Sequence, residues 1–189
     1  MQFAAKHLRL PEIILVTPRR FTDVRGYFME VYEAAAFRRL GITAEFVQDN
    51  QAGSLRRGTI RGLHFQKTPH AQGKLVRVIA GAIFDVAVDI RRGSETFGQW
   101  VGTTLDAAKG EQLFVPRGFA HGYCTLADDT VVAYKCDAAY APQAEGGINF
   151  ADPDLAIAWP KMSEPVALSD RDRALPRLRD LANICPAEA

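Results

Sequence analysis

Residues 61–90 constrain the fold of this chain more than any other stretch, because apolar and other residues alternate along them. Every second residue from Phe84 to Ile90 is large and apolar, and Asp85 and Asp89 lie between them. Such alternation is typical of a β-strand with two different faces. Two carboxylates are poor neighbours for a dry core, so the pattern predicts that they line a polar cavity.

The strand that precedes this one carries His64 and Gln66, which share a face because they are two residues apart. A titratable imidazole is therefore predicted to point into the same cavity as the carboxylates. The stretch as a whole predicts three successive strands. From this pattern alone, His64 is also compatible with a core histidine whose hydrogen bonds are satisfied.

Short strands dominate the chain from Phe46 onward, and glycines separate one from the next. Many short strands with one early helix are typical of an antiparallel β-sandwich or barrel. The helix is predicted over residues 33–40, because alanine is frequent there and Gly41 stands where helices commonly end.

The N-terminal part is predicted as an arm of about residues 1–30. Residues 8–21 predict a short strand, and the two prolines within it favour an edge position. A hairpin that turns at Gly26 follows. A plain hairpin explains its charged residues as well as contact with a ligand does.

The C-terminal part, about residues 141–189, is rich in proline and is predicted to have an irregular course. We expect it to wrap around the barrel and to end in short helical turns around residues 169–184. The length of 189 residues predicts a single domain over residues 1–189.

Composition excludes several classes of partner. A formal net charge of +1 provides no basic field to hold nucleic acid or an anionic membrane, although a few local cations suffice for an anionic small molecule. Cys124, Cys136 and Cys185 form no CxxC pair, which argues against a disulfide framework or a structural zinc site. The first residues lack the apolar run of a signal peptide, and no segment approaches a membrane span. A cytoplasmic enzyme or binding protein is the expectation.

The segment GEQLFVPRGFAH, which ends at His121, resembles the second signature of the cupin barrel. Metal-binding cupins have two histidines separated by one residue in the first signature, whereas this chain has His64, Phe65 and Gln66 there. Thr125 replaces an expected asparagine. Two histidines without a clear third ligand make a poor transition-metal site, so the resemblance implies the barrel without a metal or other cofactor.

Nine blocks in order sharpen this resemblance: FTDVRGYFME, FVQDN, RGLHFQ, AQGKLVRV, GAIFDVAVDIRRGSETFGQW, QLFVPRGFAHGY, VVAYKCDAAYAP, EGGINFADPDLAIAWP and LSDRD. Over roughly residues 8–180 the chain is similar to the dTDP-4-dehydrorhamnose 3,5-epimerase family, whose members are metal-free cupins that make dTDP-L-rhamnose precursors. The resemblance implies a mainly β fold, a cupin-type antiparallel β-barrel (jelly roll) with a few short helices.

The resemblance implies four catalytic residues. His64 would be the base, and Asp172 would fix its tautomer and stabilise the imidazolium. Tyr134 would be the general acid, since a phenol with a pKa of ~10 is protonated at neutral pH. Lys74 would lie beside the enolate oxygen. Each has a structural alternative: a core histidine, a helix-capping box that begins at Ser169, a buried tyrosine and a solvated strand end.

The resemblance also implies a set of residues that hold the nucleotide sugar: Arg25, Glu30, Gln48, Asn50, Arg61, His121, Tyr140, Glu145 and Arg171. Arginines near a diphosphate make bidentate bonds, and Tyr140 is implied to stack on the thymine. Arg171 stands where the family more often has lysine, which keeps the positive charge. The arm around Arg25 is implied to reach into the neighbouring subunit of a homodimer.

The implied function is epimerisation at C3 and C5 of dTDP-4-dehydro-6-deoxy-D-glucose, giving dTDP-4-dehydro-L-rhamnose through an enolate. The nearest alternative inverts only C3 or only C5 of a dTDP-4-keto-6-deoxysugar and serves another pathway. A metal-dependent cupin such as a dioxygenase is a second alternative. A non-catalytic cupin that binds sugar nucleotides is a third.

Overall fold

The computed structural model describes residues 2–161 and 167–181 of the chain. Its elements in chain order are β1 (Phe3–His7), β2 (Ile14–Pro18), β3 (Arg20–Asp23), β4 (Gly26–Met29), α1 (Ala34–Arg39), β5 (Gln48–Ser54), β6 (Ile60–Gln66), β7 (Lys74–Ala80), β8 (Ala82–Asp89), β9 (Trp100–Asp106), β10 (Gln112–Val115), β11 (Phe119–Thr125), β12 (Thr130–Cys136), η1 (Pro142–Ala144), β13 (Glu145–Gly147), α2 (Asp170–Arg173) and η2 (Leu178–Asp180).

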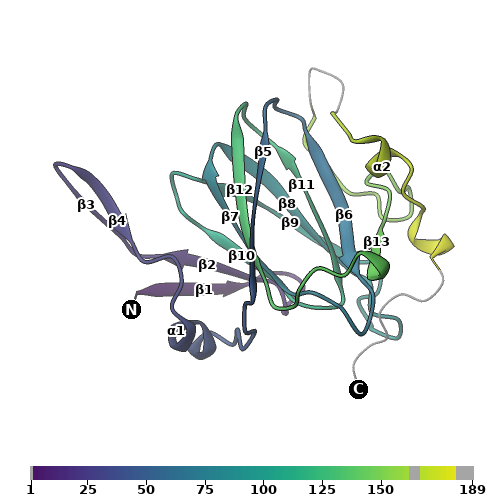
Figure 1. Ribbon diagram of the computed structural model, residues 1–189, viewed down its shortest axis with the longest axis horizontal. Coiled ribbons are helices and arrows are strands. Elements are labelled where there is room, and N and C mark those ends of the chain that lie inside the picture. The colour runs from purple at the N-terminus through teal and green to yellow at the C-terminus, as the bar shows by residue number, and fades with distance from the viewer. Residues whose placement is uncertain (1, 162–166, 182–189) are drawn as a thin grey trace.

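Two antiparallel sheets face each other and form the barrel (Figure 1). The six-stranded sheet has the order β1-β2-β10-β7-β12-β5, and the five-stranded sheet has the order β13-β6-β11-β8-β9. The sequence prediction of a mainly β antiparallel barrel with a few short helices is confirmed. The strands β3 and β4 form a separate hairpin.

The three strands predicted within residues 61–90 are present as β6, β7 and β8, but they do not all lie side by side. The strands β6 and β8 both pair with β11, whereas β7 belongs to the opposite sheet. The chain therefore crosses between the sheets twice. As a result, His64 on β6 and Lys74 on β7 come from facing walls of the barrel.

Both faces of β8 are buried, which the alternating pattern did not predict. Ile83 and Ala87 belong to the apolar cluster inside the barrel. Val86 and Val88 face the other way and pack against Leu178 and other apolar residues of the C-terminal segment. Complete burial of a Val or Ile side chain stabilises the fold by roughly 1.5–3 kcal/mol.

The two carboxylates of β8 do not line a polar cavity, so that prediction was wrong. Asp89 is fully buried and accepts hydrogen bonds from Arg91, Ser94 and Thr96. Asp85 is also fully buried and accepts a hydrogen bond from a histidine ring. Local partners bind both oxygens of Asp89 and one oxygen of Asp85, because a strand face with mixed residues can also meet a buried polar network.

The predicted helix is confirmed as α1. The Glu33 side chain caps it by accepting hydrogen bonds from the backbone N–H groups of Ala35 and Ala36. Gly41 follows with a φ of 87°, a conformation that favours glycine. Six residues are too few for a helix to be stable alone, so the buried ring of Phe37 holds it against the outer face of the six-stranded sheet.

The strand predicted near the N-terminus exists as β2, but its expected edge position was wrong. It pairs with β10 on one side and with β1 on the other. Pro11 precedes the strand and Pro18 ends it, so neither proline interrupts the pairing. The edge strand β1 was not predicted.

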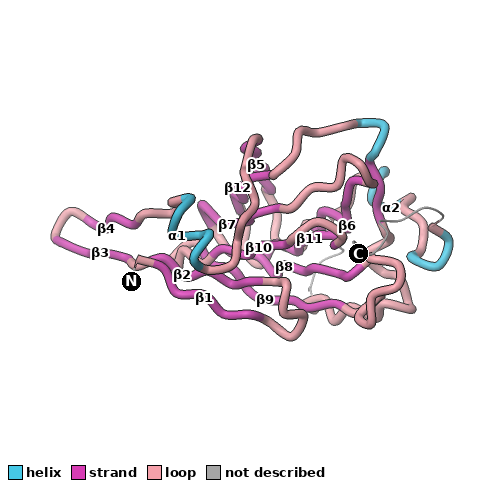
Figure 2. The backbone as a smooth tube through the Cα atoms, turned by 90° about the horizontal axis from the view of Figure 1, so that it is seen from below, coloured by secondary structure: helices cyan, strands magenta, loops and turns pink. Residues whose placement is uncertain are grey.

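The predicted hairpin is confirmed as β3 and β4. It extends away from the barrel in both views (Figures 1 and 2), and nearly all its side chains are exposed. Val24 at its tip and Tyr27 and Phe28 on β4 are among the exposed apolar residues. A hairpin with this much exposed aromatic surface has no core of its own.

The C-terminal segment covers the outer face of the five-stranded sheet, as predicted, and ends in α2 and η2 (Figure 1). Residues 182–184 of the predicted helical turns lie outside the described residues, and so does Cys185. Cys124 and Cys136 are buried free thiols. Among the described residues no helix is long and apolar enough to cross a membrane.

Candidate active site

A polar cavity of about 260 Å³ opens between the two sheets. Side chains from β5, β6, β7, β12 and the segment that follows β12 surround it. The lining residues are Gln48, Asn50, His64, Phe65, Gln66, Gln72, Lys74, Tyr134, Cys136, Tyr140 and Glu145. Seven of the predicted site residues are among them.

Two glycines bring the histidine-bearing strands β6 and β11 unusually close. A Cβ atom at Gly62 would lie 2.7 Å from the Cα of Gly122, and one at Gly122 would lie 2.7 Å from the carbonyl oxygen of Arg61. Any side chain at either position would push the strands apart. The close approach lets His64 and His121 face each other as partners in the strand register.

His64 forms a hydrogen-bonded pair with Asp172, which lies on α2. The distance from His64 Nε2 to Asp172 Oδ1 is 2.7 Å, and the backbone N–H of Gly62 donates to Asp172 Oδ2 at 3.3 Å. The capping alternative holds as well, because Ser169 Oγ accepts from the backbone N–H of Asp172 at 3.0 Å. The cap and the pairing therefore act together, since the helical turn orients the carboxylate toward the ring.

Burial lowers the pKa of His64 below its usual 6.5, while the hydrogen bond and the charge of Asp172 act in the opposite direction. The imidazole side chain is 33% exposed, so a molecule in the cavity can reach it. A histidine with a lowered pKa is neutral near pH 7 and can accept a proton.

Lys74 and Tyr134 lie on the opposite sheet from His64 and also line the cavity. Burial lowers the pKa of the Lys74 ammonium, and its Nζ donates to the carbonyl oxygen of His64 at 3.5 Å. Burial raises the pKa of the Tyr134 phenol, which keeps it protonated. The cavity thus holds a proton acceptor on one wall and proton donors on the other.

Three charged and polar side chains meet at one side of the cavity. Glu145 accepts from Arg171 at 2.5 Å and from the hydroxyl of Tyr140 at 2.7 Å. Gln48 links this group to Asn50, another lining residue. The Oε1 of Gln48 accepts from the backbone N–H of Tyr140, and its Nε2 donates to Asn50.

Six of the predicted residues are not among the lining residues. Asp172 and Arg171 bind the lining residues His64 and Glu145, and the other four are Arg25, Glu30, Arg61 and His121. Arg25 is exposed on the hairpin and pairs with Asp23 at 2.6 Å, and Glu30, which follows the hairpin, accepts from Gln2. Arg61 bonds to Ser54 and to the carbonyl oxygen of Gly53. His121 is buried beside His64, where its Nε2 donates to Asp85 Oδ1 at 2.6 Å.

Sequence reasoning missed Gln72 and Cys136 as lining residues. The alternation along β12 was a signal for Cys136, because residues 134 and 136 share a strand face. Asn50 Nδ2 lies 3.6 Å from the Cys136 sulfur, and burial raises the pKa of that thiol. Gln72 lies in a loop, where no periodicity identifies the direction of a side chain.

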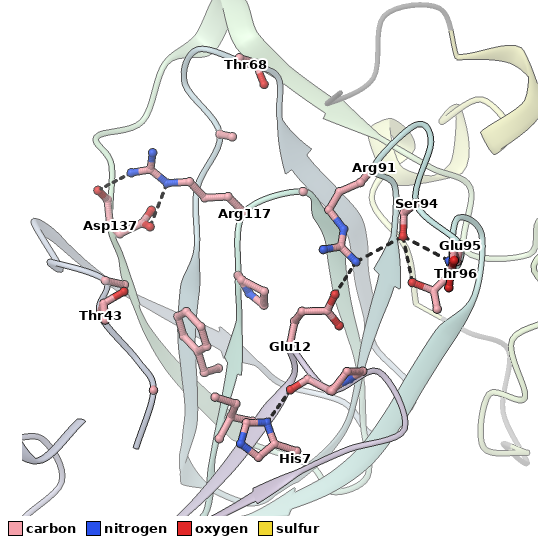
Figure 3. Close-up of a pocket in the computed structure, with 18 residues that line it drawn as sticks. His7, Glu12, Thr43, Thr68, Arg91, Ser94, Glu95, Thr96, Arg117 and Asp137 are labelled. Carbon is pink, nitrogen blue, oxygen red and sulfur yellow. Dashed lines mark hydrogen bonds and ion pairs between the residues drawn. The ribbon is translucent and has the colours of Figure 1, made fainter. Parts of the chain in front are cut away.

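A larger hollow of about 840 Å³ lies elsewhere on the molecule, and it contains none of the predicted residues (Figure 3). Its arginines are paired within it: Arg117 binds Asp137 at 2.9 Å, and Arg91 binds Glu12 at 2.7 Å. Since these cations already have partners, the smaller cavity is the better candidate for chemistry.

Among the described residues no group of three or more histidine, cysteine or carboxylate side chains is arranged to hold a metal ion. The arrangement can instead remove a proton at His64 and return one from Tyr134, with Lys74 beside the charge that develops. The barrel and the residues of this cavity together indicate a protein that rearranges its ligand by acid–base chemistry.

Comparison with known proteins identifies the family within this class. A sequence model of the dTDP-4-dehydrorhamnose 3,5-epimerase family matches residues 7–180. An enzyme of that name from Sinorhizobium fredii is 49% identical over 174 residues, which cover 92% of this chain and 89% of the relative. This chain belongs to the dTDP-4-dehydrorhamnose 3,5-epimerase family.

Solved structures agree with this assignment. The dTDP-6-deoxy-D-glucose-3,5-epimerase of Legionella pneumophila, in complex with dTDP-4-keto-L-rhamnose, is 42% identical and has a TM-score of 0.94, over 99% of this chain and 100% of that chain. A 3'-monoepimerase from Streptomyces bikiniensis, in complex with dTDP-quinovose, is 35% identical and has a TM-score of 0.84, over 91% of this chain and 86% of that chain.

Proposed function

We propose that this protein inverts C3 and C5 of dTDP-4-dehydro-6-deoxy-D-glucose and so makes dTDP-4-dehydro-L-rhamnose, in the synthesis of dTDP-L-rhamnose. The observation that carries the proposal is the His64–Asp172 pair, 2.7 Å between Nε2 and Oδ1, which shares one cavity with Lys74 and Tyr134. The names of the most similar relatives support the choice of substrate.

The reaction begins with removal of a proton next to the C4 carbonyl. Both C3–H and C5–H are α to this carbonyl, so loss of either proton gives an enolate. His64 takes the proton, and Asp172 stabilises the imidazolium that forms. Lys74 donates to the enolate oxygen, and one well-placed donor of this kind lowers the barrier by roughly 3–4 kcal/mol.

Inversion requires that the proton return to the other face of the ring. Tyr134 is the donor, because its phenol is protonated and it belongs to the sheet opposite His64. The same pair serves C3 and then C5 if the sugar presents each carbon in turn. No metal or cofactor takes part in these steps.

The number of inverted carbons distinguishes this proposal from its nearest rival. A 3'-monoepimerase is among the similar structures, so single inversion is the alternative. After incubation with the dTDP-4-keto sugar in D₂O, NMR should find deuterium at both C3 and C5. Deuterium at C3 alone, after long incubation, would identify a 3-epimerase.

The substrate-binding residues outside the cavity lead to a proposal about assembly. We propose that the protein is a homodimer in which the hairpin of each subunit completes the site of the other, bringing Arg25 and Glu30 to the nucleotide. In support, the hairpin extends away from its own barrel and exposes Tyr27 and Phe28. The cytoplasmic location, and the absence of nucleic-acid and membrane partners, stay predictions from the sequence.

Hybrid dimers test the exchange of arms. His64→Ala and Arg25→Ala each leave a homodimer with two defective sites, whereas a hybrid with exchanged arms has one site in which both residues are intact. Co-expression of the two variants should therefore restore about a quarter of the wild-type rate, since about half of the dimers are hybrids with one complete site. Arms that stay on their own subunit would give no recovery, and a monomeric mass in light scattering would exclude the dimer.

A further inference from the structure

The segment between β12 and η1 forms one side of the cavity, although residues 138–141 belong to no helix or strand. Tyr140 lies in this segment and is one of the lining residues. Backbone N–H and C=O groups outside helices and strands need other hydrogen-bond partners wherever they are shielded from water. The partners of this segment therefore determine where Tyr140 lies.

Gln66 is buried and holds this segment on both sides of Tyr140. Its Oε1 accepts from the backbone N–H of Ala141 at 2.7 Å, and its Nε2 donates to the carbonyl oxygen of Ala139 at 3.5 Å. Along the backbone Gln66 is the register partner of Glu145, whose carboxylate accepts from the Tyr140 hydroxyl at 2.7 Å. One residue of β6 thus contacts the chain before Tyr140, the chain after it and the strand that binds its hydroxyl.

Two more glutamines that line the cavity hold the same segment. Gln72 Nε2 donates to the carbonyl oxygen of Ala138 at 2.7 Å, and Gln48 Oε1 accepts from the backbone N–H of Tyr140 at 2.9 Å. Each residue from 138 to 141 therefore has a backbone group bonded to a lining glutamine. An amide suits this purpose because it carries both a donor and an acceptor.

The ring of Tyr140 stays open to a ligand, since the residue is 51% exposed although its N–H and its hydroxyl are both bonded. An aromatic face fixed at the side of a cavity offers a stacking surface to a planar ring, and the proposed substrate carries one in its thymine base. The acid–base groups are held separately, because His64 and Tyr134 each lie in a strand that is paired on both sides. A shift of the segment would therefore weaken nucleotide binding more than it would slow the chemistry.

We propose that Gln66 and Gln72 are positioning residues for the nucleotide. Through the backbone of residues 138–141 they hold the Tyr140 ring where the base of the substrate stacks on it. Neither glutamine is among the predicted site residues. Gln66 stands where metal-binding cupins have a second histidine, so here an amide that anchors the cavity wall takes the place of a metal ligand. The proposal rests on the proposed function, since it takes a dTDP-sugar as the ligand.

A double-mutant cycle with Tyr140 tests this role, because a residue that acts through another has no effect once that other residue is removed. Gln66→Met and Gln72→Met nearly keep the size of the side chain and remove the amide. Calorimetry measures the Kd for dTDP, and NMR measures kcat as deuterium incorporation at saturating sugar. Tyr140→Ala should weaken dTDP binding by roughly 5–150-fold, the range for one base stacked on an aromatic ring.

Each glutamine variant should weaken dTDP binding by roughly 2–10-fold, the net effect of one hydrogen bond, and should leave kcat nearly unchanged. In the Tyr140→Ala background neither variant should weaken binding further. Thr130→Val is the matched control, because it also removes a buried side-chain donor to a backbone carbonyl, that of Ala127, but at the other end of β12. It should leave the Kd for dTDP unchanged.

Additive losses of dTDP affinity in the double variants would overturn the proposal, because the glutamines would then act on the nucleotide without Tyr140. A fall of kcat as large as the loss of affinity would overturn it too, since that is the mark of a collapsed cavity. Full affinity of Tyr140→Ala for dTDP would overturn the positioning role and leave the proposed epimerisation intact, whereas wild-type protein that does not bind dTDP would overturn the proposed function itself. If circular dichroism shows that Gln66→Met does not fold, Gln72→Met decides the matter.

Discussion

His64 and His121 are neighbours on adjacent strands, and each binds a carboxylate through Nε2, at 2.7 and 2.6 Å respectively. They differ in access, since 33% of the His64 side chain is exposed but only 7% of that of His121. Their partners differ in origin as well. Asp172 comes from α2 in the C-terminal segment, whereas Asp85 lies on β8, beside the strand that carries His121.

The difference shows that a histidine–carboxylate pair does not by itself make a base. A molecule in the cavity can reach His64, the proposed base, whereas burial confines His121 to contacts with protein groups. The origin of the partner matters too, because Asp172 is oriented by the Ser169 cap and by the Gly62 backbone N–H. The C-terminal segment therefore supplies the hydrogen bond that orients the His64 imidazole.

Removal of the proposed base should have the largest effect, and it tests directly whether the two histidines differ in role. His64→Ala should lower the rate by at least roughly 10²–10⁴-fold, the usual contribution of a positioned acid or base. The measurement is incorporation of deuterium into the sugar, with circular dichroism to verify folding. His7→Ala, at a histidine outside the cavity, is the control and should retain full activity. Near wild-type activity of His64→Ala would mean that another residue is the base.

Removal of the enolate donor should come next. Lys74→Met keeps most of the volume of the side chain but removes the donor, so kcat should fall by roughly 10²–10³-fold. The affinity for dTDP should change little, because Lys74 is proposed to act at the sugar and not at the nucleotide. Lys109→Met, at an exposed lysine, is the matched control. Equal losses of kcat and of dTDP affinity would instead indicate a collapsed cavity.

Asp172→Asn should have a smaller effect, because the imidazole remains but loses a charged partner. A hydrogen bond to a charged group is worth about 1.5–3 kcal/mol, which corresponds to a loss of roughly 10–100-fold. The pH profile gives a second measurement. Burial holds the pKa of His64 below 6.5, so the acidic limb of kcat/KM should lie below that pH in the wild type.

Asp172→Asn should also shift the acidic limb of kcat/KM, in a direction set by the groups that determine the pKa of His64. Asp172 raises the pKa of His64 through its hydrogen bond and its charge, so loss of the charge should move the acidic limb to still lower pH. A limb that moves to higher pH would show that Asp172 does not stabilise the imidazolium. Asp170→Asn, on the same helical turn, should leave the limb in place.

The fold was predictable where local rules decide it. Short strands, the helix that ends before Gly41 and the hairpin all depend on neighbouring residues, and each is present. The position of β2 in its sheet and the pairing of Asp85 depend on residues far apart in the chain. Alternation gives the face of a side chain but not what covers that face, which is why β8 was predicted to line a cavity.

The site was predictable mainly through the nine sequence blocks. Spacing alone does not predict that Asp172 binds His64, since 108 positions separate them in the sequence. The blocks nominated His64, Lys74 and Tyr134, which the fold brings to one cavity. The blocks also nominated Arg25, but it lies on a hairpin that extends away from its own barrel and does not line the cavity of its own chain.

Metal removal should have the smallest effect, namely none, and it tests whether the two histidines act as an acid–base set or as a pair of metal ligands. Both Nε2 atoms already bind carboxylates. The position of the missing cupin histidine is Gln66, whose amide donates to the carbonyl oxygen of His70 and accepts from the backbone N–H of Ala141. A metal would have to displace these bonds and would still lack a third strong ligand.

Prolonged EDTA treatment should therefore leave the rate of deuterium incorporation unchanged, and metal analysis should find far less than one equivalent. Stoichiometric iron, zinc or manganese whose removal abolishes turnover would instead favour a metal-dependent reaction in which both histidines are metal ligands.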